Sequence, residues 1–303
     1  MKAIEADVTR NGHIFTANES AADQKCFRDN FDSIPFIFHH NLSADPRFGM
    51  DCIKALALRL PNTVSFNGAA GVGKGWSQSG NWGATVEDAL NKLEQGGSWI
   101  ILKRIHQDPD YAELLSKCLS EVEELVHRHL KQEIESRTMS LILSSPEQVT
   151  PYHIDGDCNF LFQIKGSKTI YVFDGRNRSI LTDTEEENFW CGDISAAKYR
   201  EENQSKAWEF GLKPGNGVHV PVIYPHWVKN QKAVSMSLSI NFRFHGRKRA
   251  DVFRANRYIR KMGLNPRSVG ESKMMDSIKG ETFFWKRRVM GKLQGLRKRI
   301  SGR

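Results

Sequence analysis

With 303 residues, 39% of them hydrophobic and 26% charged, the chain has the composition of a globular protein that can bury a substantial core. No apolar run approaches the ~18 residues of a membrane span, and residues 1–11 are polar, so we expect neither a transmembrane segment nor a secretory signal. The five cysteines contain no Cys-x-x-Cys pair, which favours free thiols and a cytoplasmic location.

The first part of the chain predicts helices and one strand. Residues 1–47 have no clear periodicity and are expected to be irregular, with the apolar run Phe36–His40 docking on the core. His39 and His40 could bind a metal, but structural roles are favoured. Apolar spacing, with a Thr85-x-x-Asp88 cap before the second helix, predicts the following elements: helices at 51–60, 86–95 and 112–134, the last carrying His127 and His129, and a strand at 98–104.

After Thr138 the apolar residues tend to recur at every second position, as they do in β-strands. Between residues 234 and 240, apolar residues alternate strictly with serine, which is typical of a half-buried strand. Many short strands without helices between them indicate a β-sandwich or jelly roll with flanking helices, hence an α+β protein whose core is mainly β. The polar, acidic stretch 174–207 is expected to be a long rim loop. The strands are predicted at 139–143, 150–155, 159–164, 168–173, 208–212, 217–221 and 233–244.

The C-terminal part is strongly basic. The net charge of +9 divides into +14 for residues 245–303 and −5 for the rest. Helices are predicted at 250–262 and 281–300; the second has a dense basic face and an apolar stripe, formed by Phe284, Val289, Met290, Leu293, Leu296 and Ile300. We therefore predict three regions: a helical and mixed region at 1–135, a β core at 136–246 and a basic helical extension at 247–303.

The stretch Gly68–Gly75 matches the G-x-x-x-x-G-K part of a phosphate-binding loop. The Ser or Thr that should follow the lysine and bind Mg²⁺ is Gly75, and residues 76–81 make a poor start for the required helix. A flexible loop near the mouth of an active site is the better interpretation.

His153 and Asp155 form an H-x-D pair on a predicted strand, where residues two apart face the same side. A second histidine from a distant strand would complete a triad of two histidines and one carboxylate, the arrangement that leaves open positions on Fe(II). His226, in Pro221-Val222-Ile223-Tyr224-Pro225-His226, is the preferred third ligand, and His219 is its rival.

The surroundings of this pair resemble the JmjC-type, cupin-like 2-oxoglutarate oxygenases, and are most similar to the asparaginyl hydroxylases that modify hypoxia-inducible factor. The resemblance covers about residues 145–245 and rests on four segments: Thr150-Pro151-Tyr152-His153-Ile154-Asp155, Asn159, Phe160-Leu161-Phe162-Gln163-Ile164-Lys165-Gly166 with Lys168, and Ser239-Ile240-Asn241-Phe242.

This resemblance implies a double-stranded β-helix and an enzyme that uses Fe(II), 2-oxoglutarate and O2. It implies that His153, Asp155 and His226 are the catalytic metal ligands. It further implies that Lys168 and Thr150 bind the far carboxylate of 2-oxoglutarate, and that Asn159 and Asn241 line the co-substrate.

Three positions depart from the family pattern. Asn216 follows Pro214-Gly215 where the family often has aspartate, Arg243 replaces an aromatic residue, and Ile101 lies near the place of a tyrosine that contacts 2-oxoglutarate. These departures concern the substrate and the co-substrate rather than the metal triad.

We therefore expect an Fe(II)- and 2-oxoglutarate-dependent dioxygenase that hydroxylates a C–H bond of a protein side chain or small molecule and releases succinate and CO2. The alternatives are a non-catalytic cupin-like binding or regulatory module, or an N-methyl demethylase with the same chemistry. The basic tail could bind an anionic partner, and the resemblance favours a homodimer through the C-terminal helices.

Overall fold

The computed structural model describes residues 12–68, 72–73, 89–90, 93, 98–246 and 248–286. Packing divides the chain into two compact units. The first, which we call the barrel unit, contains residues up to 175 together with 199–244; the second, the helical unit, contains 176–198 and the residues from 245 onward. The division into three regions at 1–135, 136–246 and 247–303 stays a prediction.

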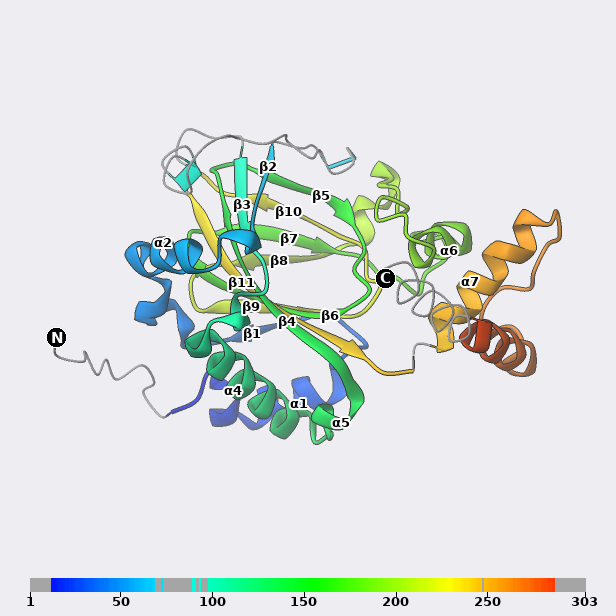
Figure 1. The fold of residues 1–303 in the computed structure, drawn as a ribbon, viewed down its shortest axis with the longest axis horizontal. Helices are drawn as coiled ribbons and strands as arrows, with labels where there is room; N and C mark the ends of the chain where they lie inside the picture. Colours follow the sequence, from blue (N-terminus) through cyan, green and yellow to red (C-terminus); the bar gives the residue numbers. More distant parts are fainter. Residues whose placement is uncertain are drawn as a thin grey trace, which may run out of the picture. The chain divides into compact units, whose positions relative to one another are not determined.

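The barrel unit is built from two sheets (Figure 1) in which every described strand pair is antiparallel. This arrangement confirms the predicted mainly β core with flanking helices. The larger sheet has the order β1 (Phe36–His39), β9 (Asn216–Val220), β6 (Cys158–Lys165), β11 (Ser235–Phe244), β4 (Ile134–Ser144), β3 (Ser98–Leu102) and β2 (Val64–Gly68). The smaller sheet has the order β5 (Val149–His153), β10 (His226–Asn230), β7 (Lys168–Val172) and β8 (Trp208–Leu212).

The alternation of serine and apolar residues along β11 places apolar side chains on one face of the larger sheet and serines on the other. Its apolar residues Met236, Leu238 and Ile240 belong to a large core on one face of the larger sheet. The intervening Ser235 and Ser237 are fully buried on the opposite face, because successive side chains of a strand point to opposite sides. A separate apolar cluster combines residues of β6 and β9 with residues of β7, β8 and β10, so the two sheets pack face to face.

Helices α1 and α4 cover the outer face of the larger sheet (Figure 1). Helix α4 begins after Asp108, whose side chain accepts the N–H of Asp110, and it ends where His127 adopts a left-handed conformation. The predicted single helix at 112–134 is therefore interrupted at 127–129: His127 and His129 lie in the turn between α4 and the short helix α5. The helices of this unit are α1 (Ala21–Asn30), α2 (Met50–Arg59), α4 (Pro109–Val126) and α5 (Leu130–Glu133), with 3-10 turns at η1 (Thr16–Glu19), η2 (Leu42–Ala44), η3 (Pro46–Phe48), η4 (Pro61–Thr63), η6 (Ile105–Gln107) and η7 (Glu201–Lys206).

The N-terminal stretch is more regular than its sequence suggested. Helix α1 and strand β1 both lie in the part expected to be irregular, and their aromatic residues Phe27 and Phe38 pack against Phe160 of β6. The helix predicted at 51–60 is confirmed as α2. The helix predicted at 86–95 and the loop at Gly68–Gly75 lie largely outside the described residues.

The helical unit contains α6 (Asp183–Trp190), α7 (Lys248–Lys261) and a helical stretch at 273–286. Helix α6 corrects the prediction of a rim loop at 174–207. Its start is a capping box in which the Thr182 hydroxyl accepts the N–H of Glu185 and the Glu185 carboxylate accepts the N–H of Thr182. The helix predicted at 250–262 is confirmed as α7, whereas the one at 281–300 is described only to residue 286.

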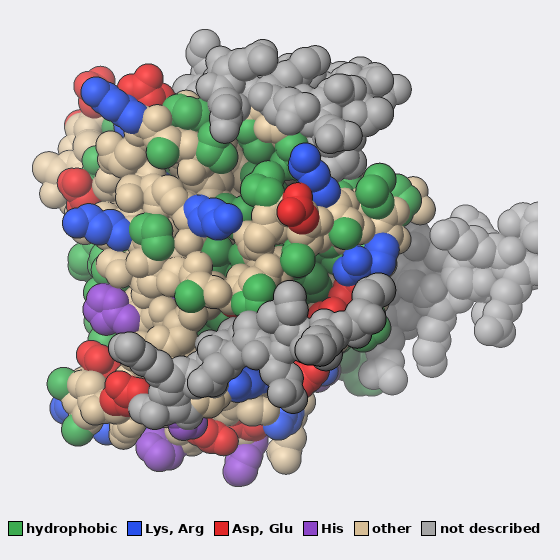
Figure 2. Space-filling model, turned by 90° about the vertical axis from the view of Figure 1, so that its left-hand side faces the viewer, with side chains coloured by type: hydrophobic (Ala, Val, Ile, Leu, Met, Phe, Trp, Pro, Cys, Tyr) green, Lys and Arg blue, Asp and Glu red, His purple; other side chains and the backbone are tan. Residues whose placement is uncertain are grey.

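No described helix is long and apolar enough to cross a lipid bilayer. On the face of the molecule in Figure 2, apart from what the grey atoms cover, apolar side chains are scattered among polar ones and charges of both signs are interspersed. That visible surface carries no patch of one charge.

Candidate metal and co-substrate site

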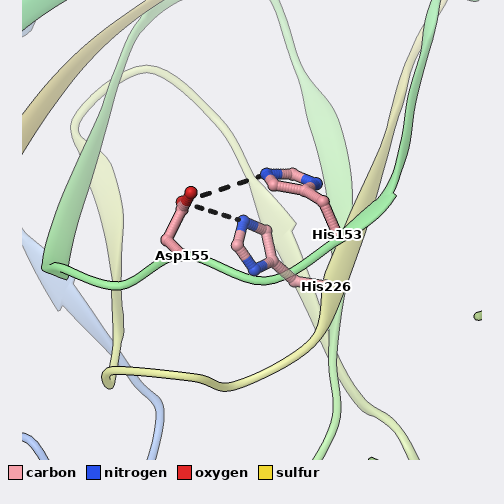
Figure 3. A group of neighbouring side chains, drawn as sticks. All are labelled: His153, Asp155 and His226. Carbon is pink, nitrogen blue, oxygen red and sulfur yellow. Dashed lines mark ion pairs between the residues drawn. The ribbon is translucent and has the colours of Figure 1, made fainter. Parts of the chain in front are cut away.

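The pairing of β5 with β10 brings two of the predicted ligands together. His153 lies opposite His226, and their ring centroids are 4.1 Å apart. Asp155 follows β5, and one of its oxygens, Oδ2, lies 3.9 Å from Nε2 of His153 and 3.8 Å from Nε2 of His226 (Figure 3). The three potential ligand atoms all lie within 4.8 Å of one another. Both imidazoles are buried, and Asp155 is partly exposed.

A β-bulge adjoins the first histidine. His226 pairs with His153, but the next pairing along β10 joins Val228 to Thr150, so β5 has one residue more than β10 over this interval. The additional residue falls at Pro151-Tyr152, where proline has no N–H to contribute to the ladder. The freed N–H of Tyr152 donates to the carbonyl of Val72, 2.9 Å away. One residue of the Gly68–Gly75 stretch therefore lies beside the metal-site strand.

Backbone carbonyls fix which nitrogen of each imidazole faces Asp155. Nδ1 of His153 lies 2.7 Å from the carbonyl of Pro151, and Nδ1 of His226 lies 3.0 Å from the carbonyl of Tyr224. A carbonyl can only accept a hydrogen bond, so both Nδ1 atoms carry a proton and both Nε2 atoms face Asp155. Burial, reinforced by the neighbouring His153, lowers the pKa of His226 to about 4, which keeps that ring neutral at physiological pH.

The rival histidine has a different environment. His219 is fully buried on β9; its Nε2 accepts the N–H of Asp32 at 2.9 Å, and its Nδ1 lies 3.0 Å from the carbonyl of Asn159. Both ring nitrogens are thus engaged by the backbone, and the triad contains His226 instead. His40 is similarly engaged, by the carbonyl of Asn216 and the N–H of Leu42.

Lys168 is a buried cation on β7. Its side chain lies on the same face as Ile170 and Val172, and Val172 pairs with His226, so the lysine is on the face of the smaller sheet that carries the ligands. Only 5% of the residue is exposed, and burial lowers its pKa from 10.5 to about 7. Among the described residues no carboxylate forms an ion pair with it. An unpaired buried ammonium is costly, which is the property expected of a site for an anionic ligand.

The structure also brings together the two predicted asparagines, which are paired across β6 and β11. Nδ2 of Asn159 lies 2.7 Å from Oδ1 of Asn241 and 2.7 Å from Oγ of Ser239. Thr150 is partly exposed and pairs with Val228. Sequence reasoning missed Ser239 as a partner of both amides; the alternation of serine with apolar residues along β11 was the signal for it.

Two of the residues that depart from the family pattern, Arg243 and Ile101, have defined neighbours in the structure. Nε and Nη2 of Arg243 donate to the two carboxylate oxygens of Asp157 at 3.0 and 3.2 Å. Ile101 pairs with Ile142 of β4, the strand next to β11. At these two positions the structure therefore has an ion pair and an apolar contact.

The donor set fits a divalent transition metal. Two imidazoles whose Nε2 atoms converge with one carboxylate are the kind of ligand set that suits non-haem Fe(II). Asp155 is the only acid among the three side chains, so the group offers one carboxylate to a divalent cation.

The sequence matches no family model and no curated protein. The fold is similar to that of YcfD, a ribosomal oxygenase from Escherichia coli. One YcfD structure, with cobalt and 2-oxoglutarate, gives a TM-score of 0.50 at 14% identity and covers 90% of this chain and 67% of that one. Another gives a TM-score of 0.50 at 15% identity and covers 86% and 65%. The chain spans about two thirds of the length of the YcfD chains, and the similarity shows a shared fold.

Proposed function

We propose that the protein is an Fe(II)- and 2-oxoglutarate-dependent oxygenase that hydroxylates a C–H bond of a protein side chain or small molecule, with release of succinate and CO2. The observation that carries this proposal is the convergence of His153, Asp155 and His226, with both imidazole tautomers fixed by backbone carbonyls. The YcfD complex with cobalt and 2-oxoglutarate supports it as a relative in fold.

In this proposal His153, Asp155 and His226 hold the iron, which when bound would supply the oxidation chemistry at its remaining open positions. The chain itself turns the Nε2 atoms of both imidazoles toward one point, and it places one carboxylate beside them. Because both histidines lie on paired strands of one sheet, no loop has to close to assemble the ligands.

Lys168 is proposed to bind the far carboxylate of 2-oxoglutarate, with Thr150 beside it. Lys168 pairs with Asn230, four residues along β10 from His226, which is a separation of ~13 Å along the strand. The lysine side chain and a five-carbon diacid can together span that separation. Asn159 and Asn241, already hydrogen-bonded to each other, would line the co-substrate from the facing sheet.

The test is succinate release by the purified protein supplied with Fe(II), O2 and 2-oxoglutarate, measured against a panel that includes ribosomal proteins, free amino acids and peptides. Substrate-dependent succinate release with a matching mass gain of one oxygen supports hydroxylation, and loss of an N-methyl group as formaldehyde would identify a demethylase. Binding of metal and 2-oxoglutarate without turnover across the panel would favour the non-catalytic module.

For partners we propose a homodimer formed by the C-terminal helices. In the helical unit six large apolar side chains are exposed on α7, just after it and on the stretch 273–286, namely Tyr258, Met262, Met274, Met275, Ile278 and Trp285. Exposed large apolar side chains of this kind favour burial in an interface with a second copy of the chain. Much of the basic character of α7 is satisfied internally, through ion pairs such as Lys248–Glu281 and Arg260–Glu187.

Deletion of residues 270–303 should convert a dimer into a monomer in light scattering. Because the deletion also removes the Glu281 partner of Lys248, the point variant Ile278→Asp is the sharper test. Ser277→Asp, at the neighbouring exposed position, is the matched control. A full-length protein that is monomeric at micromolar concentration would contradict the dimer and leave an anionic partner as the role of the basic tail. A cytoplasmic location is proposed from the five cysteines, all of which are free.

A further inference from the structure

The outer face of the smaller sheet carries a group of aromatic residues directly behind the candidate metal ligands. Side chains alternate along a strand, so Tyr152, which precedes His153, and Trp227, which follows His226, point away from the ligands. Both are buried to 9% exposure. We call this group, formed by Tyr152, Tyr171, Phe173, Tyr199 and Trp227, the outer aromatic cluster.

The rings of this cluster touch in a continuous series. Trp227 stacks on Tyr171 of β7, with centroids 4.2 Å apart and planes inclined by 16°. Tyr199 meets Trp227 at 6.4 Å and Tyr152 at 5.6 Å, in both cases edge to face. Tyr152 also meets Phe173 at 5.4 Å. Tyr199 thereby joins β5 to β10 from outside, although it belongs to neither strand.

One polar side chain anchors Tyr199 to the sheet. Oε1 of Gln204 accepts hydrogen bonds from the hydroxyl of Tyr199 at 3.0 Å and from Nε1–H of Trp227 at 3.2 Å. Tyr199 and Gln204 lie in the segment that leads into and forms η7, before β8. Gln204 is itself only half-buried, so it is not a core residue.

We infer that Gln204 is a positioning residue for the metal site: by holding Tyr199 against Trp227 it fixes the rotation of β5 and β10 about their own axes, and hence the direction in which His153 and His226 project. This inference rests on the proposed function. Adjacent residues of a strand share one backbone, so a rotation of the backbone that carries Trp227 also turns His226.

The bulge explains why such support is needed at this place. Pro151-Tyr152 interrupts the ladder between β5 and β10 next to His153, so hydrogen bonds between the strands do not by themselves fix the twist there. Ring contacts on the outer face supply that constraint. Groups that orient metal ligands typically change metal affinity by about 10- to 100-fold when removed, and Gln204, one step further out, should have a smaller effect.

The experiment uses the full-length protein with Co(II) as the probe. Gln204→Leu removes the acceptor, Gln204→Glu keeps it, and Gln231→Leu is the matched control at an exposed glutamine that contacts Thr169 of the same sheet. We expect Gln204→Leu to weaken Co(II) binding roughly three- to tenfold and to change the visible d–d spectrum of the bound ion. Gln204→Glu and Gln231→Leu should bind and absorb like the wild type.

A purely structural role would lower the thermal midpoint of the metal-free Gln204→Leu protein and leave the Co(II) affinity and spectrum unchanged; that result would overturn the inference. A wild-type protein that binds no Co(II) would instead refute the proposed function. Loss of Co(II) binding in Gln204→Leu that Gln204→Glu fails to restore would also count against an acceptor role for Gln204.

Discussion

In the helical unit, three buried carboxylates each lie against an arginine: Glu186 against Arg178 at 2.8 Å, Glu187 against Arg260 at 3.0 Å, and Asp251 against Arg254 at 2.7 Å. The inner face of the smaller sheet in the barrel unit is different. Lys168 is buried there, no carboxylate among the described residues forms an ion pair with it, and the Asp155 carboxylate lies near two histidines.

The difference separates charges that serve the fold from charges that serve a ligand. A buried ion pair with good geometry offsets the desolvation of both groups, and removing either partner leaves an expensive charge. A buried charge without a partner destabilises the ligand-free protein. Such a charge is retained where a bound ion of opposite charge pairs with it. On this basis we propose that the acidic helix α6 is structural, whereas Lys168 and the triad serve a binding site.

The largest expected effect is at the triad. His153→Ala, Asp155→Ala and His226→Ala should each abolish iron-dependent turnover and weaken Co(II) binding by at least ~100-fold, because each removes a ligand, while far-ultraviolet circular dichroism stays unchanged. His219→Ala should retain Co(II) binding but unfold at a lower temperature, since it removes backbone hydrogen bonds from a buried site. The reverse pattern would show that His219 is the third ligand.

In the helical unit the effect should be on stability alone. Arg260→Ala leaves the carboxylate of Glu187 buried without its partner and should cost roughly 3 kcal/mol of unfolding free energy. Arg257→Ala, on the same helix, is the control, because the described residues show no ion pair for Arg257. Chemical denaturation measures both. A change in the Co(II) affinity of Arg260→Ala would contradict the assignment of this ion pair to the stability of the fold alone.

Lys168→Ala should raise the 2-oxoglutarate concentration needed for half-maximal turnover roughly ten- to a hundredfold, with little effect on metal binding. This range corresponds to ~1.5–3 kcal/mol for a lost charge-assisted hydrogen bond. Titration of 2-oxoglutarate into the Co(II) form provides a direct measurement. Unchanged 2-oxoglutarate affinity in Lys168→Ala would show that Lys168 does not bind the co-substrate.

The smallest effect concerns the metal-free, ligand-free protein. Because burial lowers the pKa of Lys168 from 10.5 to about 7, the unfolded chain holds more protons than the native one between these values, and stability from this group rises with pH across that window. Lys168→Met should therefore stabilise the empty protein most below pH 7, by on the order of 1–3 kcal/mol, with a gain that shrinks toward pH 10.5. Thermal unfolding at several pH values measures it, and equal gains at all pH values would exclude Lys168 titration as the cause.

Much of the architecture could be predicted from local patterns. The two-residue alternation along β11, the helical spacing of α2 and the basic periodic pattern of α7 each depend on neighbours within a few residues, and the structure contains all three elements. The capping box Thr182–Glu185 was equally local, so α6 could have been recognised. The acidic composition of that stretch suggested a solvated loop because its arginine partners lie mostly in α7, far along the chain.

The sequence by itself predicted that His153 and Asp155 lie together, because they are two residues apart in an extended segment, although β5 ends at His153 and Asp155 follows it. It favoured His226 over His219 through the resemblance around Pro221 to His226, but it could not show which of the two lies beside His153. Only the tertiary structure decided this: β10 pairs with β5 and brings His226 beside His153, whereas β9 pairs with β1 and β6 and places His219 among backbone partners. The bulge at Pro151-Tyr152 and the outer aromatic cluster were also decided at that level, because strand pairing and ring contacts join residues that are distant in the chain and leave no local periodic signal.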